Sequence, residues 1–119
     1  IYATKAALKE GIVPGGGVAL LNASKEMNVR TAGADILASA MRAPFNTIMS
    51  NAGYDLDSLP DTRGIGVNVV TGEEVNMVND GIVDPVLVTK TALKNAVSVA
   101  LTIMSADCVI SNIRVNESD

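Results

Sequence analysis

The segment that most constrains the fold runs from Asp84 to Ala106, because its pattern is that of one long apolar helix. Its start is well marked, since an aspartate suits the N-cap position and the following proline suits the first helical turn. Within the segment, a narrow polar stripe is formed by Thr91, Asn95, Ser98, Thr102 and Ser105. A helix that is apolar over most of its circumference is expected near the centre of a protein. We therefore predict a mainly α-helical fold with this helix at its centre, ending near Ala106.

The composition predicts that part of the apolar surface contacts other protein. Charged residues make up 18% of the chain and hydrophobic residues 48%, whereas ~25% charged residues is usual for soluble domains. Too few charges are present to cover a small globule, so apolar surface should meet the rest of a larger subunit or a neighbouring subunit. No bilayer span is expected, because the apolar run from Ala96 to Ala106 is interrupted by Ser98, Thr102 and Ser105.

The composition also excludes several classes of site. The net charge is −4 and no cluster of Lys or Arg is present, so nucleic-acid binding is not expected. The chain has no His, which excludes His-based metal sites and Ser-His-Asp triads, and no metal site is predicted. The single Cys108 cannot form an internal disulfide, which fits a reducing compartment. Any chemistry must therefore use carboxylates, backbone groups and a cofactor.

Glycine and proline divide the rest of the chain into predicted elements. Residues 2–10 are typical of a helix that stops at Gly11, and residues 18–26 of a second helix. Apolar residues recur at helical spacing from 34 to 51, where Pro44 is expected to separate two consecutive helices. Two β-prone runs around a glycine-containing turn predict a small β-hairpin over about 67–78, and a short C-terminal strand is predicted over about 108–115.

Gly15, Gly16 and Gly17 come directly before a predicted helix. Glycines let a ligand approach the backbone closely, and the free amides at the start of a helix attract anions. The run is not a P-loop, because no Gly-Lys-Ser/Thr follows, and it is not a dinucleotide fingerprint, because no strand is predicted before it. A tight turn between two helices is therefore the simpler interpretation of the local pattern.

Asp84 and Asn68 each allow two interpretations. Asp84 either caps the helix that follows or accepts hydrogen bonds from ligand hydroxyls such as those of a ribose, and a carboxylate has lone pairs for both. Asn68 stands in a β-prone run, where Asn is disfavoured, so it either stabilises a turn or presents its amide to a nucleobase. The residues alone leave both questions open.

Taken in order, several motifs resemble those of the bacterial-type (group I) 60 kDa chaperonins. The clearest are Glu-Gly-Ile-Val-Pro-Gly-Gly-Gly at residues 10–17 and the spacing from Asn68 to Gly-Ile-Val-Asp-Pro at residues 81–85. Ala43-Pro44 with Asn51-Ala52-Gly53 resembles the family's helix pair, and Ala106-Asp107-Cys108-Val109-Ile110 its final strand. The match covers residues 1–119, which resemble the C-terminal part of the equatorial, ATP-binding domain.

The resemblance implies an ATP-dependent protein-folding subunit that binds ATP or ADP. The residues that would form the nucleoside site are Gly15, Gly16, Asn68, Val69, Val70, Ile82 and Asp84. The two glycines would pack against the ribose and Asp84 would hold its hydroxyls, while residues 68–70 line the adenine and Ile82 packs on the base. The family usually has alanines where Val69 and Val70 stand, so the larger side chains would crowd the adenine.

The resemblance also implies what other parts of such a subunit supply. The family's phosphate loop, its Mg and K contacts and its water-activating Asp lie upstream, so no catalytic residue is expected within residues 1–119. The segment alone is therefore expected to be inactive, although the full subunit would hydrolyse ATP. The apical and intermediate domains are expected to be absent, and with them the binding of unfolded clients and of a co-chaperonin.

The implied assembly is a homo-oligomeric double ring of sevenfold symmetry. It would lie in the cytoplasm, or in an organelle matrix if the source is eukaryotic. In the family, the strand that resembles residues 108–115 joins a small sheet with a neighbouring subunit. A truncated or degenerate chaperonin that assembles without turnover is the alternative.

Overall fold

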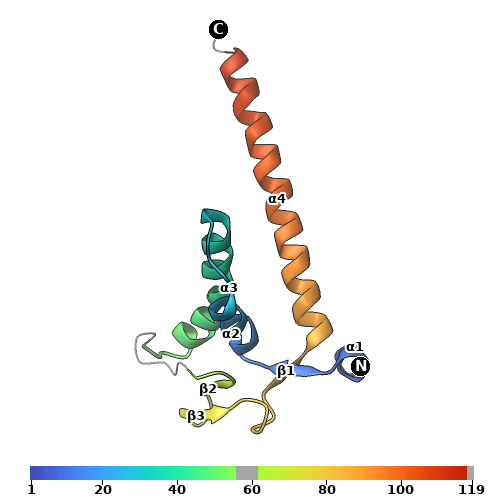
Figure 1. Cartoon of the computed structure of the whole chain (residues 1–119), viewed down its shortest axis with the longest axis vertical. Helices are drawn as coiled ribbons and strands as arrows, with labels where there is room; N and C mark the ends of the chain where they lie inside the picture. The colour runs from blue at the N-terminus through green and yellow to red at the C-terminus, as the bar shows by residue number, and fades with distance from the viewer. Residues whose placement is uncertain (56–61, 118–119) are drawn as a thin grey trace.

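The computed structural model describes residues 1–55 and 62–117, with side chains as far as Ala106. In chain order the elements are α1 (Tyr2–Glu10), β1 (Ile12–Pro14), α2 (Val18–Glu26), α3 (Ala32–Asn51), β2 (Ile65–Asn68), β3 (Glu73–Asn76), β4 (Val83–Pro85) and α4 (Val86–Glu117). The strands form two separate antiparallel pairs, β1 with β4 and β2 with β3. Figure 1 shows α4 as a single long helix that extends well beyond the other elements. The prediction of a mainly α-helical fold with small β elements is confirmed.

Glycines set the boundaries of the first two helices, as predicted. Gly11 ends α1 with φ 91°, and its amide donates to the carbonyl of Ala7 at 2.8 Å. Gly17, with φ 79°, directly precedes α2. Both glycines have backbone conformations that an L side chain rarely adopts, so the chain turns sharply before and after β1.

Helix α3 runs through Pro44 without a break, so the prediction of two consecutive helices is wrong. The proline removes one backbone hydrogen bond, but its fixed φ is compatible with a helix. Buried side chains continue along one face on both sides of it, at Ala38, Met41, Phe45 and Met49. Packing of this face against the rest of the core outweighs the local cost of the proline.

The start of α3 provides a stability test. The Thr31 hydroxyl accepts a hydrogen bond from the amide of Ala34 at 3.1 Å, as an N-cap side chain does. Thr31→Ala should lower the free energy of unfolding by about 1 kcal/mol in denaturant titrations of the protein. Thr31→Ser keeps the acceptor and should match the parent. Equal losses in the two variants would contradict the capping role.

Strands β2 and β3 form the predicted hairpin. Ile65 pairs with Asn76, and Asn68 pairs with Glu73, which leaves residues 69–72 as the connection. Gly72 has φ 77°, and its amide donates to the carbonyl of Asn68 at 2.7 Å. The hairpin therefore lies close to its predicted position, with its strands over 65–76 rather than 67–78.

The pairing of β1 with β4 joins two segments that are far apart in the sequence, and it was not predicted. Val13 lies opposite Asp84 in this pair. The amide of Val86, the first residue of α4, donates to the carbonyl of Gly11 at 3.1 Å. The predicted N-cap role of Asp84 is therefore wrong, because Asp84 lies in the strand β4 and pairs with β1. Within residues 1–55 and 62–106, the Asp84 carboxylate has no hydrogen-bond partner.

The hydrophobic core lies between α2, α3 and the hairpin. Its buried members are Val18, Leu21, Phe45, Met49, Val67 and Met77. Val18 is fully buried and directly follows Gly17. The core therefore holds the glycine loop in a fixed position relative to α3 and the hairpin.

Helix α4 extends to Glu117, so the predicted strand over about 108–115 is wrong, as is the predicted helix end near Ala106. No glycine or proline interrupts residues 86–117, so no residue in this range forces the helix to stop. A strand also needs a partner edge for its backbone hydrogen bonds, whereas a helix satisfies them within the segment.

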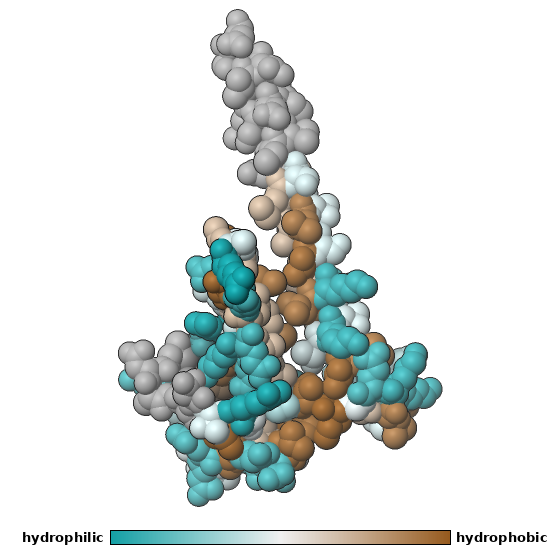
Figure 2. All heavy atoms as spheres, in the orientation of Figure 1, coloured by the Kyte–Doolittle hydropathy of each residue, from teal (hydrophilic) through white to brown (hydrophobic). Residues whose placement is uncertain are grey.

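The expected central position of α4 is not found within this chain. Its exposed apolar side chains include Val97, Val99, Leu101, Ile103 and Met104. Figure 2 shows apolar side chains along the coloured part of α4. Val86–Ala106 has the length and the mean hydropathy, 1.3, of a helix that crosses a membrane, and none of it is buried. Core helices of soluble proteins share this length and hydropathy, so the two values do not distinguish a bilayer from a protein partner.

Candidate functional site

Two adjoining hollows contain six of the seven residues singled out in the sequence. The first hollow, of about 400 Å³, is lined by Pro14, Gly16, Gly17, Ala19, Leu20, Pro44, Ile48, Asp84, Val88, Thr89 and Ala92. The second hollow, of about 480 Å³, is lined by Gly16, Ile48, Met49, Val67, Asn68, Val69, Val70, Met77 and Ile82. Gly16 and Ile48 line both, so the two hollows meet at these residues.

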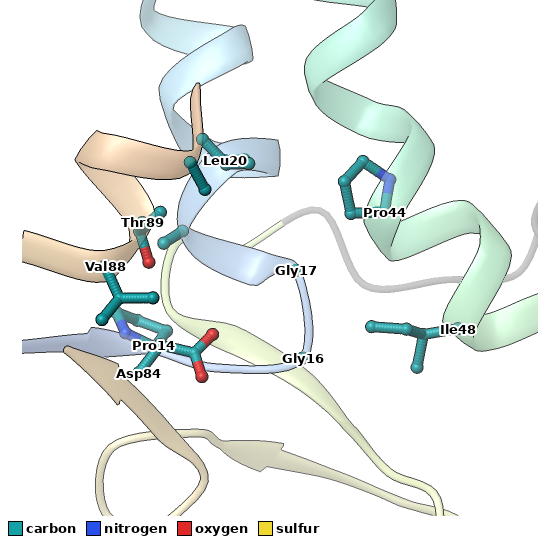
Figure 3. Close-up of a pocket in the computed structure, with 11 residues that line it drawn as sticks. Pro14, Gly16, Gly17, Leu20, Pro44, Ile48, Asp84, Val88 and Thr89 are labelled. Carbon is teal, nitrogen blue, oxygen red and sulfur yellow. The ribbon is translucent and has the colours of Figure 1, made fainter. Parts of the chain in front are cut away.

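The β1–β4 pair brings Asp84 to the first hollow. Figure 3 shows its carboxylate directed from β4 toward the loop at Gly16, with Pro44 and Ile48 of α3 on the opposite side. Of the described residues that line this hollow, Asp84 alone carries a charge. A carboxylate whose lone pairs are not used by described neighbours is well suited to accept hydrogen bonds from ligand hydroxyls.

Gly15 holds the glycine loop against the start of β4 and lines neither hollow. It is buried, and its amide donates to the carbonyl of Ile82 at 2.8 Å. A Cβ at this position would lie 3.1 Å from the amide nitrogen of Val83, so the two backbones are in close contact. A strand, β1, does precede the glycine run. Because it belongs to an antiparallel pair, the exclusion of a dinucleotide fingerprint stands.

Gly16 and Gly17 shape the loop for two different reasons. Gly16 has φ 65° and lines both hollows, where the lack of a side chain leaves its backbone open to a ligand. A Cβ on Gly17 would lie only 2.6 Å from the backbone nitrogen of Phe45. The loop is therefore in direct contact with α3 at Gly17, and this contact sets the width of the first hollow.

The second hollow is mostly apolar. Its walls include the core residues Met49, Val67 and Met77, and Ile82 packs against the same core. Val69 is 47% exposed and Val70 is 90% exposed, so much of each side chain lies in solvent rather than filling the hollow. An apolar hollow of this kind suits the faces of a flat ring.

Asn68 stabilises the hairpin turn and also borders the second hollow. Its Oδ1 accepts hydrogen bonds from the amide of Val70 at 3.0 Å and that of Thr71 at 3.4 Å, and its Nδ2 donates to Oδ2 of Asp80 at 2.8 Å. The interpretation of Asn68 as a turn residue is confirmed. Its contact with a nucleobase stays a prediction.

Together the hollows offer a hydroxyl acceptor, an open stretch of backbone, apolar walls and an amide. These groups complement a molecule with hydroxyls at one end and a flat heterocycle at the other, which is the chemistry of a nucleoside. Among residues 1–55 and 62–106, no group of three or more His, Cys, Asp or Glu is arranged to hold a metal ion.

Several lining residues were not singled out in the sequence. Pro44, Ile48, Val88 and Thr89 were assigned to helices without any role in a site. Nothing in their local pattern distinguishes them from other helix residues, since they reach the hollow only through the packing of α3 and α4 around the glycine loop. Gly17 did carry a signal, because it belongs to the triple glycine.

Comparison with known proteins gives two findings. A family model described as the TCP-1/cpn60 chaperonin family matches residues 1–114. A solved structure described as a group III chaperonin in the open state is similar to this chain, with 31% sequence identity and a TM-score of 0.76. The similarity covers 84% of this chain and 24% of that chain, so the chain spans about a quarter of the chaperonin it matches.

Proposed function

Because the chain belongs to the TCP-1/cpn60 chaperonin family, we propose that it supplies the nucleoside-binding half of the ATP site in an ATP-dependent protein-folding subunit. The observation that carries this proposal is the β1–β4 pair. It joins the glycine loop and Asp84, which are far apart in the sequence, at the edge of one hollow. A turn between two helices would need no such partner.

Each end of a nucleoside has a complementary group in this proposal. In the first hollow, Asp84 accepts hydrogen bonds from the ribose hydroxyls, and the ribose packs against the backbone at Gly16. In the second hollow, Ile82, Val69 and Val70 contact the faces of the adenine. Gly15 contributes indirectly, by holding the loop against β4.

The reacting groups belong to other parts of the proposed subunit. Phosphoryl transfer depends on charge stabilisation around metal-bound phosphates, and the residues of the two hollows include one carboxylate and no basic side chain. The Mg and K ions of a chaperonin ATPase would therefore be bound outside this segment. The group I type, the sevenfold double ring, the binding of clients and of a co-chaperonin, and a location in the cytoplasm or an organelle matrix are parts of the same proposal.

A second candidate function is assembly without turnover. The exposed apolar side chains of α4 favour it, because a surface of this kind requires a covering partner whether or not ATP is hydrolysed. The rest of the subunit, or a neighbouring one, is the proposed cover.

Nucleotide binding by the full-length subunit tests the proposal. The subunit should bind ATP saturably in a titration calorimeter and release phosphate, whereas the 119-residue chain, assayed in parallel, should release none. Binding without hydrolysis would favour the second candidate. A full-length subunit that binds no adenine nucleotide would contradict the proposed function.

A further inference from the structure

The orientation of the Asn68 side-chain amide is fixed by three contacts. An amide oxygen only accepts hydrogen bonds and an amide nitrogen only donates them. The oxygen faces the amides of Val70 and Thr71, and the nitrogen faces the carboxylate of Asp80 at 2.8 Å. Turning the amide over would set donors against the two backbone amides and an acceptor against a carboxylate. The network therefore allows only one orientation.

These contacts leave Asn68 a single free hydrogen-bonding group. Both lone pairs of Oδ1 are used by the two backbone amides, and one hydrogen of Nδ2 is used by Asp80. The second hydrogen of Nδ2 remains. Because Asn68 borders the second hollow, it has a donor to offer a ligand there and no acceptor.

We propose that Asp80 is a specificity-determining positioning residue, which holds Asn68 so that it presents only a donor to the base. This inference rests on the proposed function. A donor is matched by a purine whose ring nitrogen N1 carries a lone pair, as in adenine. It is opposed by a 6-oxopurine, in which N1 carries a hydrogen. The inference places this donor at N1 of the base, so the bases are distinguished at the ring nitrogen and not at the exocyclic amino group.

The simpler role for Asp80 is to brace the hairpin, since its bond to Asn68 links the end of β2 to the segment after β3. An exchange of the two side chains separates the roles. In Asn68→Asp with Asp80→Asn, the residue at 68 still accepts from the two backbone amides, and the residue at 80 donates to its second oxygen. The hydrogen bond between residues 68 and 80 is kept, but the group that residue 68 offers to the base becomes an acceptor.

The experiment compares the binding of ATP with that of inosine triphosphate, whose base is a 6-oxopurine, to the full-length subunit and its variants. The parent should prefer ATP by about tenfold, because a mismatched donor pair leaves a polar group unsatisfied. Asn68→Asp alone should bind both nucleotides weakly, because two carboxylates then face each other across the hairpin. The double exchange should recover binding and prefer inosine triphosphate. A double exchange that recovers binding and still prefers ATP would show that Asp80 is only a brace.

Single variants of Asp80 keep the inference testable if the exchanged pair does not fold. Asp80→Asn retains an acceptor for Nδ2, so the preference for ATP should be unchanged. Asp80→Ala releases the nitrogen and should lower that preference by about threefold or more, because a looser amide discriminates less between the bases. An unchanged preference in Asp80→Ala would overturn the inference while nucleotide binding itself stands. A parent that binds neither nucleotide would instead remove the proposed function.

Discussion

Gly17→Ala is expected to lower the free energy of unfolding of the subunit by at least about 3 kcal/mol, the largest effect on stability that the structure predicts for a single added methyl group. Two costs combine at this position. Gly17 has φ 79°, where an alanine is strained, and its Cβ would lie 2.6 Å from the backbone nitrogen of Phe45. The clash is with the backbone of α3, so no side-chain rotation relieves it.

The same substitution should also weaken nucleotide binding. Relief of the clash requires the glycine loop and α3 to move apart, and Pro44 and Ile48 of α3 form the wall of the first hollow opposite Asp84. Urea unfolding followed by circular dichroism would measure the loss of stability, and an ATP titration below the unfolding transition would measure the change in affinity.

Two other glycines serve as matched controls for Gly17. Gly53 has φ 81° but nothing within 4 Å of an added Cβ, so alanine there should cost only about 1 kcal/mol, from backbone strain alone. Gly33 lies in the first turn of α3 with open space around it and no such φ, so Gly33→Ala should leave the stability unchanged or raise it by up to about 1 kcal/mol. If Gly17→Ala lost no more stability than Gly53→Ala, the contact between the loop and α3 would not be as tight as described.

Asp84→Asn is expected to weaken ATP binding to the full-length subunit by at least about tenfold, with the free energy of unfolding within about 0.5 kcal/mol of the parent. Asparagine keeps the size of the side chain and one acceptor oxygen, but a donor replaces the second oxygen. The stability should hold because no described residue hydrogen-bonds to the Asp84 carboxylate. An N-cap aspartate would behave differently, since its loss would destabilise the helix.

The direction of this change distinguishes a hydrogen bond from a general charge effect. ATP is a polyanion and the chain has a net charge of −4, so removal of a negative charge would by itself strengthen the attraction between them. Weaker binding therefore requires the loss of a specific contact. Glu74→Gln, on an exposed residue of β3 outside both hollows, is the charge-matched control and should leave the affinity unchanged or slightly raised. Asp84→Asn binding ATP as tightly as the parent would contradict the proposed role.

Local chemistry predicted the elements whose ends are set by a single residue. Gly11 marks the end of α1 and Gly17 the start of α2, because few other residues adopt their φ values. The hairpin follows from the β-prone runs around the turn at Gly72. The prediction that Pro44 separates two helices was wrong, because it used local sequence alone. The burial of Phe45 and Met49 after the proline is a tertiary effect that local sequence does not show.

The site was predicted by resemblance more than by local pattern. Strand β1 has three residues, Ile12–Pro14, too few for any periodicity to appear, and it exists only because β4 lies beside it. The same pairing decides against the capping role of Asp84, which the Asp-Pro sequence favoured. The prediction of a terminal strand over 108–115 was wrong for a related reason. A strand there would need a partner edge, and the backbone is instead helical to Glu117.

The β1–β4 pair also has a consequence for the order in which the protein folds. The hairpin closes over a few residues, which takes microseconds, whereas the segment holding β1 meets that holding β4 only after a long loop has closed. The ion pair between Lys90 and Glu10, at 2.8 Å and 80 residues apart, fastens the same two segments. During synthesis the glycine loop emerges well before Asp84, so the hairpin core can consolidate while the first hollow does not yet exist. The first hollow, which is the proposed ribose site, can therefore form only after β4 and the first turns of α4 have emerged from the ribosome.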